Sequence, residues 1–324
     1  MCGIVAALPA YQSVTGDGAA AGLPALPGPP LAAAALLRKP ASAEKVLSDL
    51  AGEVEAALQA LSTETAGVAL LRDSPARQAL ADACSGLLEW AAELDHLLDM
   101  SSALAWDADS VEIVQDVLGQ LTDRLYTVLH DRIAVAASAR ALHPGAPTPR
   151  SALTYLAVET VLQAVDRLEV RGRDSAGLSI WVHLDDADRA GLPGSLASRA
   201  DPLLRSGSAV VTADGVCFVY KRAAIVGKLG DNAAALRRAL HDDADLHALL
   251  ALPSAAVTVL AHTRWASVGR ISEANAHPVD SCIAGAEGTG PYSVAVLNGD
   301  IDNYGALSKQ IGRASCRERV CSVV

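Results

Sequence analysis

The chain has 324 residues, of which 51% are hydrophobic and 19% are charged. This balance excludes a disordered chain and supplies ample material for a core, which must be largely aliphatic because aromatic residues make up only 3%. The formal net charge is −11 and there is no basic run, so we expect no binding to nucleic acid or to an anionic membrane.

The sequence carries no targeting or metal-binding pattern. No apolar stretch approaches the ~20 residues that span a bilayer, and the apolar N-terminus lacks the basic region of a signal peptide. The six cysteines show no metal-ligand spacing. We therefore expect a reduced, cytoplasmic protein without a metal or another cofactor.

The first part of the chain is predicted to be almost entirely helical. A short buried strand over residues 1–8 precedes a linker rich in Gly, Pro and Ala over residues 14–30. Apolar residues at helical spacing then predict three amphipathic helices, which begin near Ser42, at Ser74 and near Ser110. Three such helices joined by short loops indicate a small bundle.

After residue 150 helices and strands alternate, so the fold class is predicted to be α+β. Helical segments are expected over residues 152–169, 231–250 and 302–309. Short strands are predicted over residues 177–183, 208–212, 216–220, 256–262 and 293–297.

The tail over residues 311–324 has no amphipathic period and holds two of the six cysteines. It resembles translated read-through of a sequencing adapter, so we expect a non-native tail and a reading frame truncated near residue 310. The alternative is a natural basic tail.

Four short segments carry residues of chemical interest, and the first is Cys2. Aminopeptidases remove an initiator Met before a small residue, which would leave a thiol and a free α-amine together on Cys2. The amine, with an ordinary pKa of ~7.7–8.0, suits a general base that activates the thiol as a nucleophile. The alternative is an ordinary small residue at a terminus.

The second and third segments are RGRDSAGL, which begins at Arg171-Gly172, and HTRWAS, which is followed closely by NAHP. RGRDSAGL alone indicates a polar loop with an Asp-Ser turn. In HTRWAS, Arg264 offers a bidentate fork to a carboxylate. Trp265 is either an aromatic lid over that carboxylate or a core residue.

The fourth segment, Asn298-Gly299, follows an apolar strand. An Asn amide and a Gly backbone N–H can supply two donors to a developing oxyanion. Asn-Gly is also a common turn pair, so a hairpin or helix-entry turn is the alternative.

Together these segments resemble the class II, N-terminal nucleophile, glutamine amidotransferases. They are most similar to the glutaminase domain of the glutamine–fructose-6-phosphate aminotransferases, whose patterns are MCGIVG, RGYDSAGL, AHTRWATHG with NAHP, and HNGIIENY. The counterparts here are MCGIVA, RGRDSAGL, AHTRWASVG with NAHP, and LNGDIDNY. The resemblance covers residues 1–8 and about 151–310.

The resemblance implies a catalytic role for Cys2 as the nucleophile, with its α-amine as the base, and for Asn298 and Gly299 as the oxyanion hole. The implied reaction is attack of the thiol on the side-chain amide of glutamine, release of ammonia, and hydrolysis of a γ-glutamyl thioester. The implied fold is a four-layer αββα Ntn-hydrolase sandwich, here incomplete.

The resemblance also implies a substrate-binding role for Arg264, which would hold the α-carboxylate of glutamine. Trp265 would close over the site, and Ser267 stands where the family has a Thr hydroxyl. The loop at Arg171 and Gly172 would pack beside the N-terminal residue.

Several positions depart from the family. Val268 and Leu297 replace histidines, Arg173 replaces a tyrosine, and Asp300 replaces an apolar residue. The family's aspartate for the α-amine of glutamine would fall within the tail, where no Asp occurs. We therefore expect a divergent branch, with little activity from this chain alone.

The resemblance divides the chain into an amidotransferase domain over residues 1–10 and 151–310, a helical insertion over residues 11–150, and the tail. It implies glutamine as substrate, fructose 6-phosphate as the ammonia acceptor in a missing C-terminal half, and a homodimer of the full-length enzyme. The alternatives are a different acceptor, or a degenerate non-catalytic domain whose insertion binds a partner.

Overall fold

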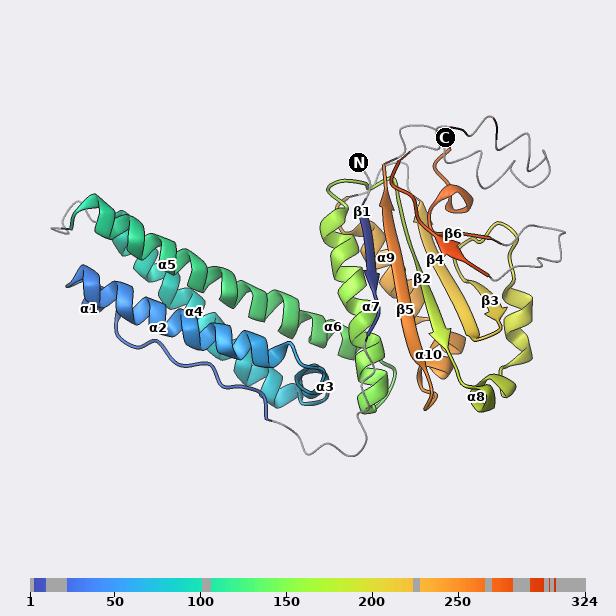
Figure 1. Ribbon diagram of the computed structural model, residues 1–324, viewed down its shortest axis with the longest axis horizontal. Coiled ribbons are helices and arrows are strands. Elements are labelled where there is room, and N and C mark those ends of the chain that lie inside the picture. Colours follow the sequence, from blue (N-terminus) through green and yellow to red (C-terminus); the bar gives the residue numbers. More distant parts are fainter. Residues whose placement is uncertain are drawn as a thin grey trace. The chain divides into compact units, whose positions relative to one another are not determined.

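The computed structural model separates the chain into two compact units, residues Met1–Ser13 with Ala141–Val324, and residues Val14–Arg140 (Figure 1). Cys2, Ser267, most of the predicted helix over 302–309 and the tail over 311–324 lie outside the described residues. The structure describes residues 3–9, 22–100, 106–223, 228–265, 270–281 and 292–299, together with Asn303 and Ala306.

The first unit is built on a five-stranded antiparallel sheet in the order β1-β5-β2-β4-β3. A second sheet pairs β6 with β7. The strands are β1 (Gly3–Ala7), β2 (Ser175–His183), β3 (Ser208–Thr212), β4 (Gly215–Ala223), β5 (Ala256–Arg264), β6 (Val279–Asp280) and β7 (Val294–Ala295).

The predicted strands are all present, although their lengths differ and β1, at the edge of the sheet, is partly exposed rather than buried. The strand over 208–212 is confirmed to the residue, whereas β2, β4 and β5 extend beyond their predicted ends and β7 is shorter. Helices together with an antiparallel sheet agree with the predicted α+β class.

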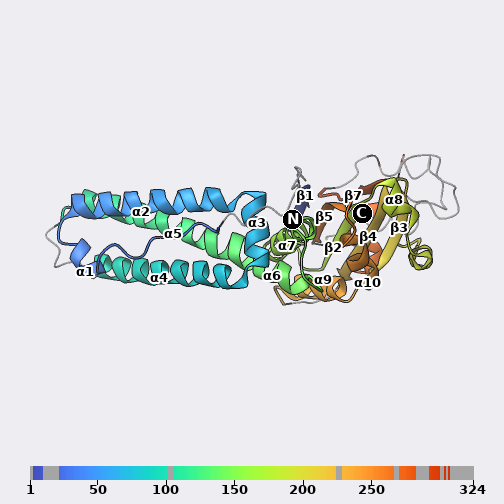
Figure 2. The same ribbon diagram turned by 90° about the horizontal axis from the view of Figure 1, so that it is seen from below.

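Helices cover one face of the five-stranded sheet, and the β6-β7 pair packs on the other (Figures 1 and 2). On the helical side, α7 (Pro149–Leu168) packs against β1 and β5, and α9 (Asp231–His241) packs against β4 and β2. On the opposite face, Cys217 and Val219 form a buried cluster that Trp181, Tyr292 and Val294 contact. The unit also contains α8 (Asp186–Ala190), η2 (Gly194–Arg199), α10 (Ala244–Leu250) and η3 (Glu273–Asn275).

The prediction of one helical segment over 231–250 is wrong, because the segment is two helices. Asp243 has an extended backbone, and its carboxylate accepts a hydrogen bond of 3.0 Å from the N–H of Leu246. Asp is a strong N-cap for this reason, so the chain ends α9 and starts α10 at this point.

The second unit is helical, as predicted, and α5 packs against both α2 and α4 along their lengths (Figure 2). Leu47, Leu87 and Leu121, one from each of these three helices, are fully buried. Across the α5–α2 contact, Arg124 Nε lies 2.7 Å from Glu55 Oε2. The helices that begin in this unit are α1 (Ala33–Leu36), α2 (Pro40–Leu61), α3 (Glu64–Arg72), α4 (Ser74–Asp99), α5 (Ala108–Tyr126), the π-helical η1 (Thr127–Ile133) and α6 (Ala134–Leu142).

The predicted start at Ser74 is confirmed, whereas the other two helices begin two residues before the predicted serines. The first begins at Pro40 rather than near Ser42, because proline at the first helical position already has a helical φ. The caps of the other two are Asp73 and Asp107, whose carboxylates accept from the N–H groups of Ala76 and Ser110. The aspartate one residue before Ser74 and the aspartate three residues before Ser110 thus cap these two helices.

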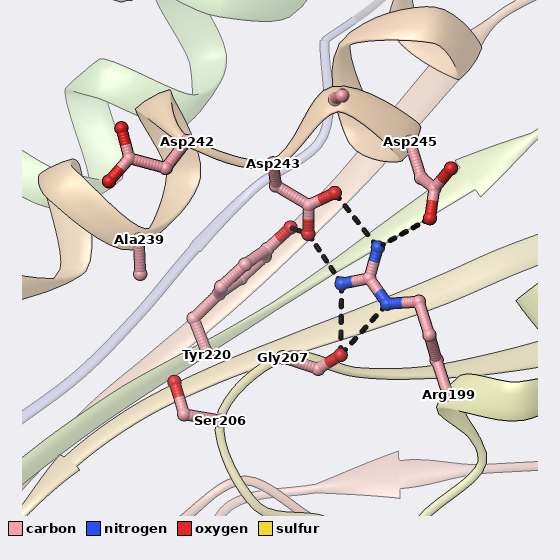
Figure 3. A pocket seen from close by; sticks show the side chains of 9 residues that line it. Arg199, Ser206, Gly207, Tyr220, Ala239, Asp242, Asp243 and Asp245 are labelled. Atoms are coloured by element: carbon pink, nitrogen blue, oxygen red, sulfur yellow. Dashed lines mark hydrogen bonds and ion pairs between the residues drawn. The ribbon is translucent and has the colours of Figure 1, made fainter.

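Arg199 joins η2 to α10 and β3 through a network in which all its N–H groups can donate (Figure 3). Nε and Nη2 donate to the carbonyl of Gly207 at 3.0 and 2.9 Å. Nη1 donates to Asp243 at 2.8 Å and to Asp245 at 3.1 Å, and Nη2 also donates to Asp243. Tyr220 adds a hydroxyl bond of 2.7 Å to Asp243. These residues line a hollow of about 480 Å³. Because the N–H groups of Arg199 already donate to protein oxygens, we interpret this network as structural.

Replacing Arg199 with methionine is expected to lower the free energy of unfolding of the first unit by about 3–5 kcal/mol, because the Asp243 side chain, only 9% exposed, would stay buried without its partner. Hydrogen exchange of the β3 and β4 amides, followed at increasing urea concentrations, measures the change in this free energy. Arg205→Met is the control, since its pair with Asp201 involves an arginine side chain that is 58% exposed, and about 0–1 kcal/mol is expected. Equal losses in the two variants would contradict this account.

The same network gives an acid dependence. Burial alone would raise the pKa of Asp243, but hydrogen bonds from Arg199, Leu246 and Tyr220 outweigh it and hold this pKa below its ordinary value. The stabilisation is therefore complete above the ordinary pKa of ~3.9 and is lost as the pH falls through the lower folded value.

Candidate functional site

The segments singled out in the sequence meet at one end of the five-stranded sheet. Antiparallel pairing places Gly3, at the start of β1, opposite Thr263 near the end of β5, and Ser175, at the start of β2, opposite Arg264. The N–H of Gly3 also donates to Oγ1 of Thr263 at 3.2 Å. Cys2 is outside the described residues, but its chain neighbour Gly3 is fixed beside the end of β5.

Arg264 lies on the sheet face opposite α7 and is only 5% exposed. Its Nη1 donates to the carbonyl of Asn275 at 3.1 Å, and Asn275 is itself held by a 3.0 Å bond from its Nδ2 to the carbonyl of Arg270. The NAHP segment therefore helps to fix the guanidinium. Trp265, the next residue, is 51% exposed, so it is not the core residue that the sequence left open.

The loop after α7 packs directly on this strand end. A Cβ at Gly172 would lie 2.7 Å from the carbonyl carbon of Arg264 and 3.0 Å from the nitrogen of Trp265. The N–H of Asp174 donates to the carbonyl of Arg264 at 3.2 Å. Arg171, in the same loop, is exposed. Glycine is thus required at 172 by the close approach of two backbones.

A buried carboxylate anchors the start of this loop. Glu169 is fully buried and accepts hydrogen bonds from the N–H groups of Gly230 at 2.7 Å and Ala233 at 2.8 Å. Burial raises the pKa of Glu169, although these N–H bonds oppose the rise. Asn232 adds a bond of 3.1 Å to the carbonyl of Arg173. The N-terminus of α9 therefore holds the loop in place, a role that no sequence pattern indicated.

Asn298 and Gly299 follow β7 and are both exposed. The residue before them, Leu297, accepts a hydrogen bond of 3.1 Å at its carbonyl from Nε2 of His262, which lies in β5 two residues before Arg264. Gly299 has a φ of 150°, a region that favours glycine. This bond brings the Asn-Gly pair to the same end of the sheet as Arg264.

Two histidines form the buried part of the site. His262 is 1% exposed and His277 is 3% exposed, and their rings meet edge to face with centroids 4.5 Å apart. Burial lowers the pKa of His262 to about 4 and that of His277 to about 3, with the charge of Arg264 adding to both effects. Both imidazoles are therefore neutral at pH 7. Sequence reasoning gave them no role, although each stands inside a quoted motif, HTRW or NAHP.

The structure thus brings together Gly172, Arg264, Trp265 and the Asn298-Gly299 pair, while Cys2 and Ser267 lie outside the described residues. Among the residues that the structure describes, no group of three His, Cys, Asp or Glu side chains is placed to hold a metal ion. Within the same residues, no helix combines the length and apolar character needed to cross a membrane.

Replacing Gly172 with alanine is expected to displace the Arg264–Trp265 backbone and to cost about 1–3 kcal/mol of stability through overpacking. A shift of the Trp265 indole signal in a ¹⁵N NMR spectrum reports the displacement. Gly86→Ala, in α4, is the matched control because a Cβ there meets nothing within 4 Å. It should leave the Trp265 signal in place, and an unmoved signal in Gly172→Ala would contradict the contact.

Comparison with known proteins finds a related sequence in Symbiobacterium thermophilum, a protein named glutamine–fructose-6-phosphate aminotransferase (isomerizing). It is 28% identical over 160 residues, which cover 49% of this chain and 17% of the relative. The chain therefore matches less than a fifth of that protein's length. No family model matches the chain, and no solved structure matches it.

Proposed function

We propose that the chain is a glutamine amidotransferase-type enzyme that removes the side-chain amide nitrogen of glutamine. The observation that carries this proposal is the meeting of the β1 start, the Gly172 loop, Arg264 and Asn298-Gly299 at one end of the sheet. The relative, which is named as a glutamine–fructose-6-phosphate aminotransferase, supports the same class of activity.

In the proposed reaction Cys2 is the nucleophile, and its α-amine takes the thiol proton. The sulfur forms a bond to the amide carbon, and the oxygen becomes an oxyanion that the Asn298 side chain and the Gly299 N–H stabilise. The C–N bond then breaks, and the amine proton passes to the leaving nitrogen as ammonia. Water attacks the thioester, releases glutamate and returns the thiol.

Substrate binding is assigned to Arg264, Trp265 and Ser267. The buried Arg264 would pair with the α-carboxylate of glutamine, because a guanidinium fixed by the carbonyl of Asn275 costs little to order on binding. The half-exposed Trp265 would cover the ligand. The Arg171–Gly172 loop supports this arrangement by packing on the backbone of Arg264 and Trp265.

The finer assignments are part of the same proposal. The proposed fold is a four-layer αββα Ntn-hydrolase sandwich, here incomplete, and the helices on one face of the five-stranded sheet with the β6-β7 pair on the other support it. Residues 11–150 are proposed to be an insertion in a domain over 1–10 and 151–310, and residues 311–324 a non-native tail. Fructose 6-phosphate is the proposed ammonia acceptor, in a homodimeric, cytoplasmic enzyme.

Glutamate release from glutamine, measured together with the intact mass of the N-terminus, tests the proposal. We expect a mature chain that begins at Cys2 and a slow hydrolysis that depends on this residue. A chain that retains Met1 and hydrolyses no glutamine would overturn the proposal in favour of a non-catalytic domain. A phosphoribosyltransferase or synthetase sequence following this one in its gene would overturn only the acceptor.

A further inference from the structure

We propose that His262 is a positioning residue, which holds the Asn298-Gly299 pair in its working geometry through the hydrogen bond from Nε2 to the carbonyl of Leu297. This inference rests on the proposed function, because it concerns the oxyanion donors of that reaction. The His262 side chain donates to the carbonyl oxygen of Leu297. It acts on the peptide that links Leu297 to Asn298.

The backbone before Asn298 needs such an anchor. β7 ends at Ala295, so the β6-β7 ladder stops before Leu297. Asn298 and Gly299 are exposed, and a glycine at a φ of 150° has few steric limits of its own. An oxyanion hole works only when its donors are already aimed at the developing charge. The bond from His262, a buried residue of β5, to the carbonyl of Leu297 fixes the backbone one residue before Asn298 and so orients the donors.

The chemistry of the bond defines the state of the imidazole. A carbonyl oxygen only accepts, so Nε2 must carry the proton and Nδ1 must be bare. Nδ1 of His262 has no hydrogen-bond partner among the described residues. The ring of His262 packs edge to face against that of His277 and lies near the charge of Arg264, and Lys221 acts on the neighbouring His277 ring. Deep burial and the charge of Arg264 both oppose a second proton on the His262 ring.

Two substitutions separate the bond from the volume of the side chain. In His262→Gln the amide can still donate to Leu297, whereas His262→Met fills similar space without a donor. We expect His262→Met to lower kcat for glutamine about 10- to 100-fold with KM changed less than twofold, since a misaimed oxyanion donor acts only in the transition state. His262→Gln should recover most of kcat. His183→Met, at the far end of β2, is the control and should keep wild-type kcat.

A spectroscopic measurement detects the bond from His262 to Leu297 independently of glutamine hydrolysis. In a ¹⁵N-histidine-labelled wild-type chain, the His262 ring should show the neutral Nε2–H tautomer throughout pH 5 to 8. An Nδ1–H tautomer, or titration of this ring near pH 6.5, overturns the inference.

The outcomes distinguish the two proposals. An active wild-type chain in which His262→Met leaves kcat unchanged overturns the positioning role and leaves the proposed function standing. A wild-type chain without Cys2-dependent hydrolysis overturns the proposed function and this inference with it. Equal losses of kcat in His262→Met and His262→Gln would also overturn the inference, because the bond would then not be what matters.

Discussion

Glutamine hydrolysis by the Cys2→Ala variant is expected to fall from the slow wild-type rate to the uncatalysed background. Alanine removes the sulfur that forms the thioester but keeps the α-amine, so no covalent intermediate can form. Cys2→Ser is expected to be inactive as well, because a hydroxyl is a weaker nucleophile at the same position. Release of glutamate from glutamine measures the loss.

A matched cysteine control separates nucleophilic chemistry from general thiol effects. Cys316→Ser changes a cysteine that the proposal leaves without a role, and it should keep the wild-type rate. Glutamine hydrolysis at the wild-type rate in Cys2→Ala would contradict the assignment of the nucleophile. So would an equal loss of activity in the two variants.

The Arg264→Met variant is expected to raise KM for glutamine about 10- to 150-fold, which corresponds to loss of a charge-assisted hydrogen bond of about 1.5–3 kcal/mol. Arg264→Lys should recover only part of the affinity, because a point charge replaces a planar fork. Steady-state kinetics with glutamine measure both effects. Arg222→Met, an exposed arginine on β4, is the control and should leave KM unchanged.

The role of Arg264 has a sharper test in a substrate that lacks its partner. 4-Aminobutanamide is glutamine without the α-carboxylate, so the wild-type chain and Arg264→Met should hydrolyse it with similar KM. If the variant were impaired equally on both substrates, Arg264 would support the fold of the site rather than bind the carboxylate.

Local patterns predicted the elements of the fold better than their ends. The short strand signal over 208–212 matched β3 to the residue. The break at Asp243 was missed, since an aspartate inside a polar helical stretch is a common surface residue. Its capping role depends on a fold that also brings Arg199 and Tyr220 to the same carboxylate.

The site divides in a similar way. Arg264, Trp265 and Gly172 were predicted from motifs, and the structure places them in contact through the backbone of β5. The bond from Gly3 to Thr263 spans 260 positions in the chain, and periodicity gives no information on such pairing. His262 is neutral because it is buried. Glu169 anchors the loop because the fold buries it against the N-terminus of α9. Burial of a polar side chain follows from the sheet topology and cannot be read from its neighbours in sequence.

The central claim, that Cys2 is a nucleophile directed at glutamine, is tested most directly by covalent labelling with 6-diazo-5-oxo-L-norleucine, an electrophilic glutamine analogue. Peptide mapping by mass spectrometry locates the adduct. The account predicts one adduct per chain, on an N-terminal peptide that begins at Cys2, and its suppression by excess glutamine. Labelling spread over several cysteines, labelling indifferent to glutamine, or no adduct on Cys2 would contradict it.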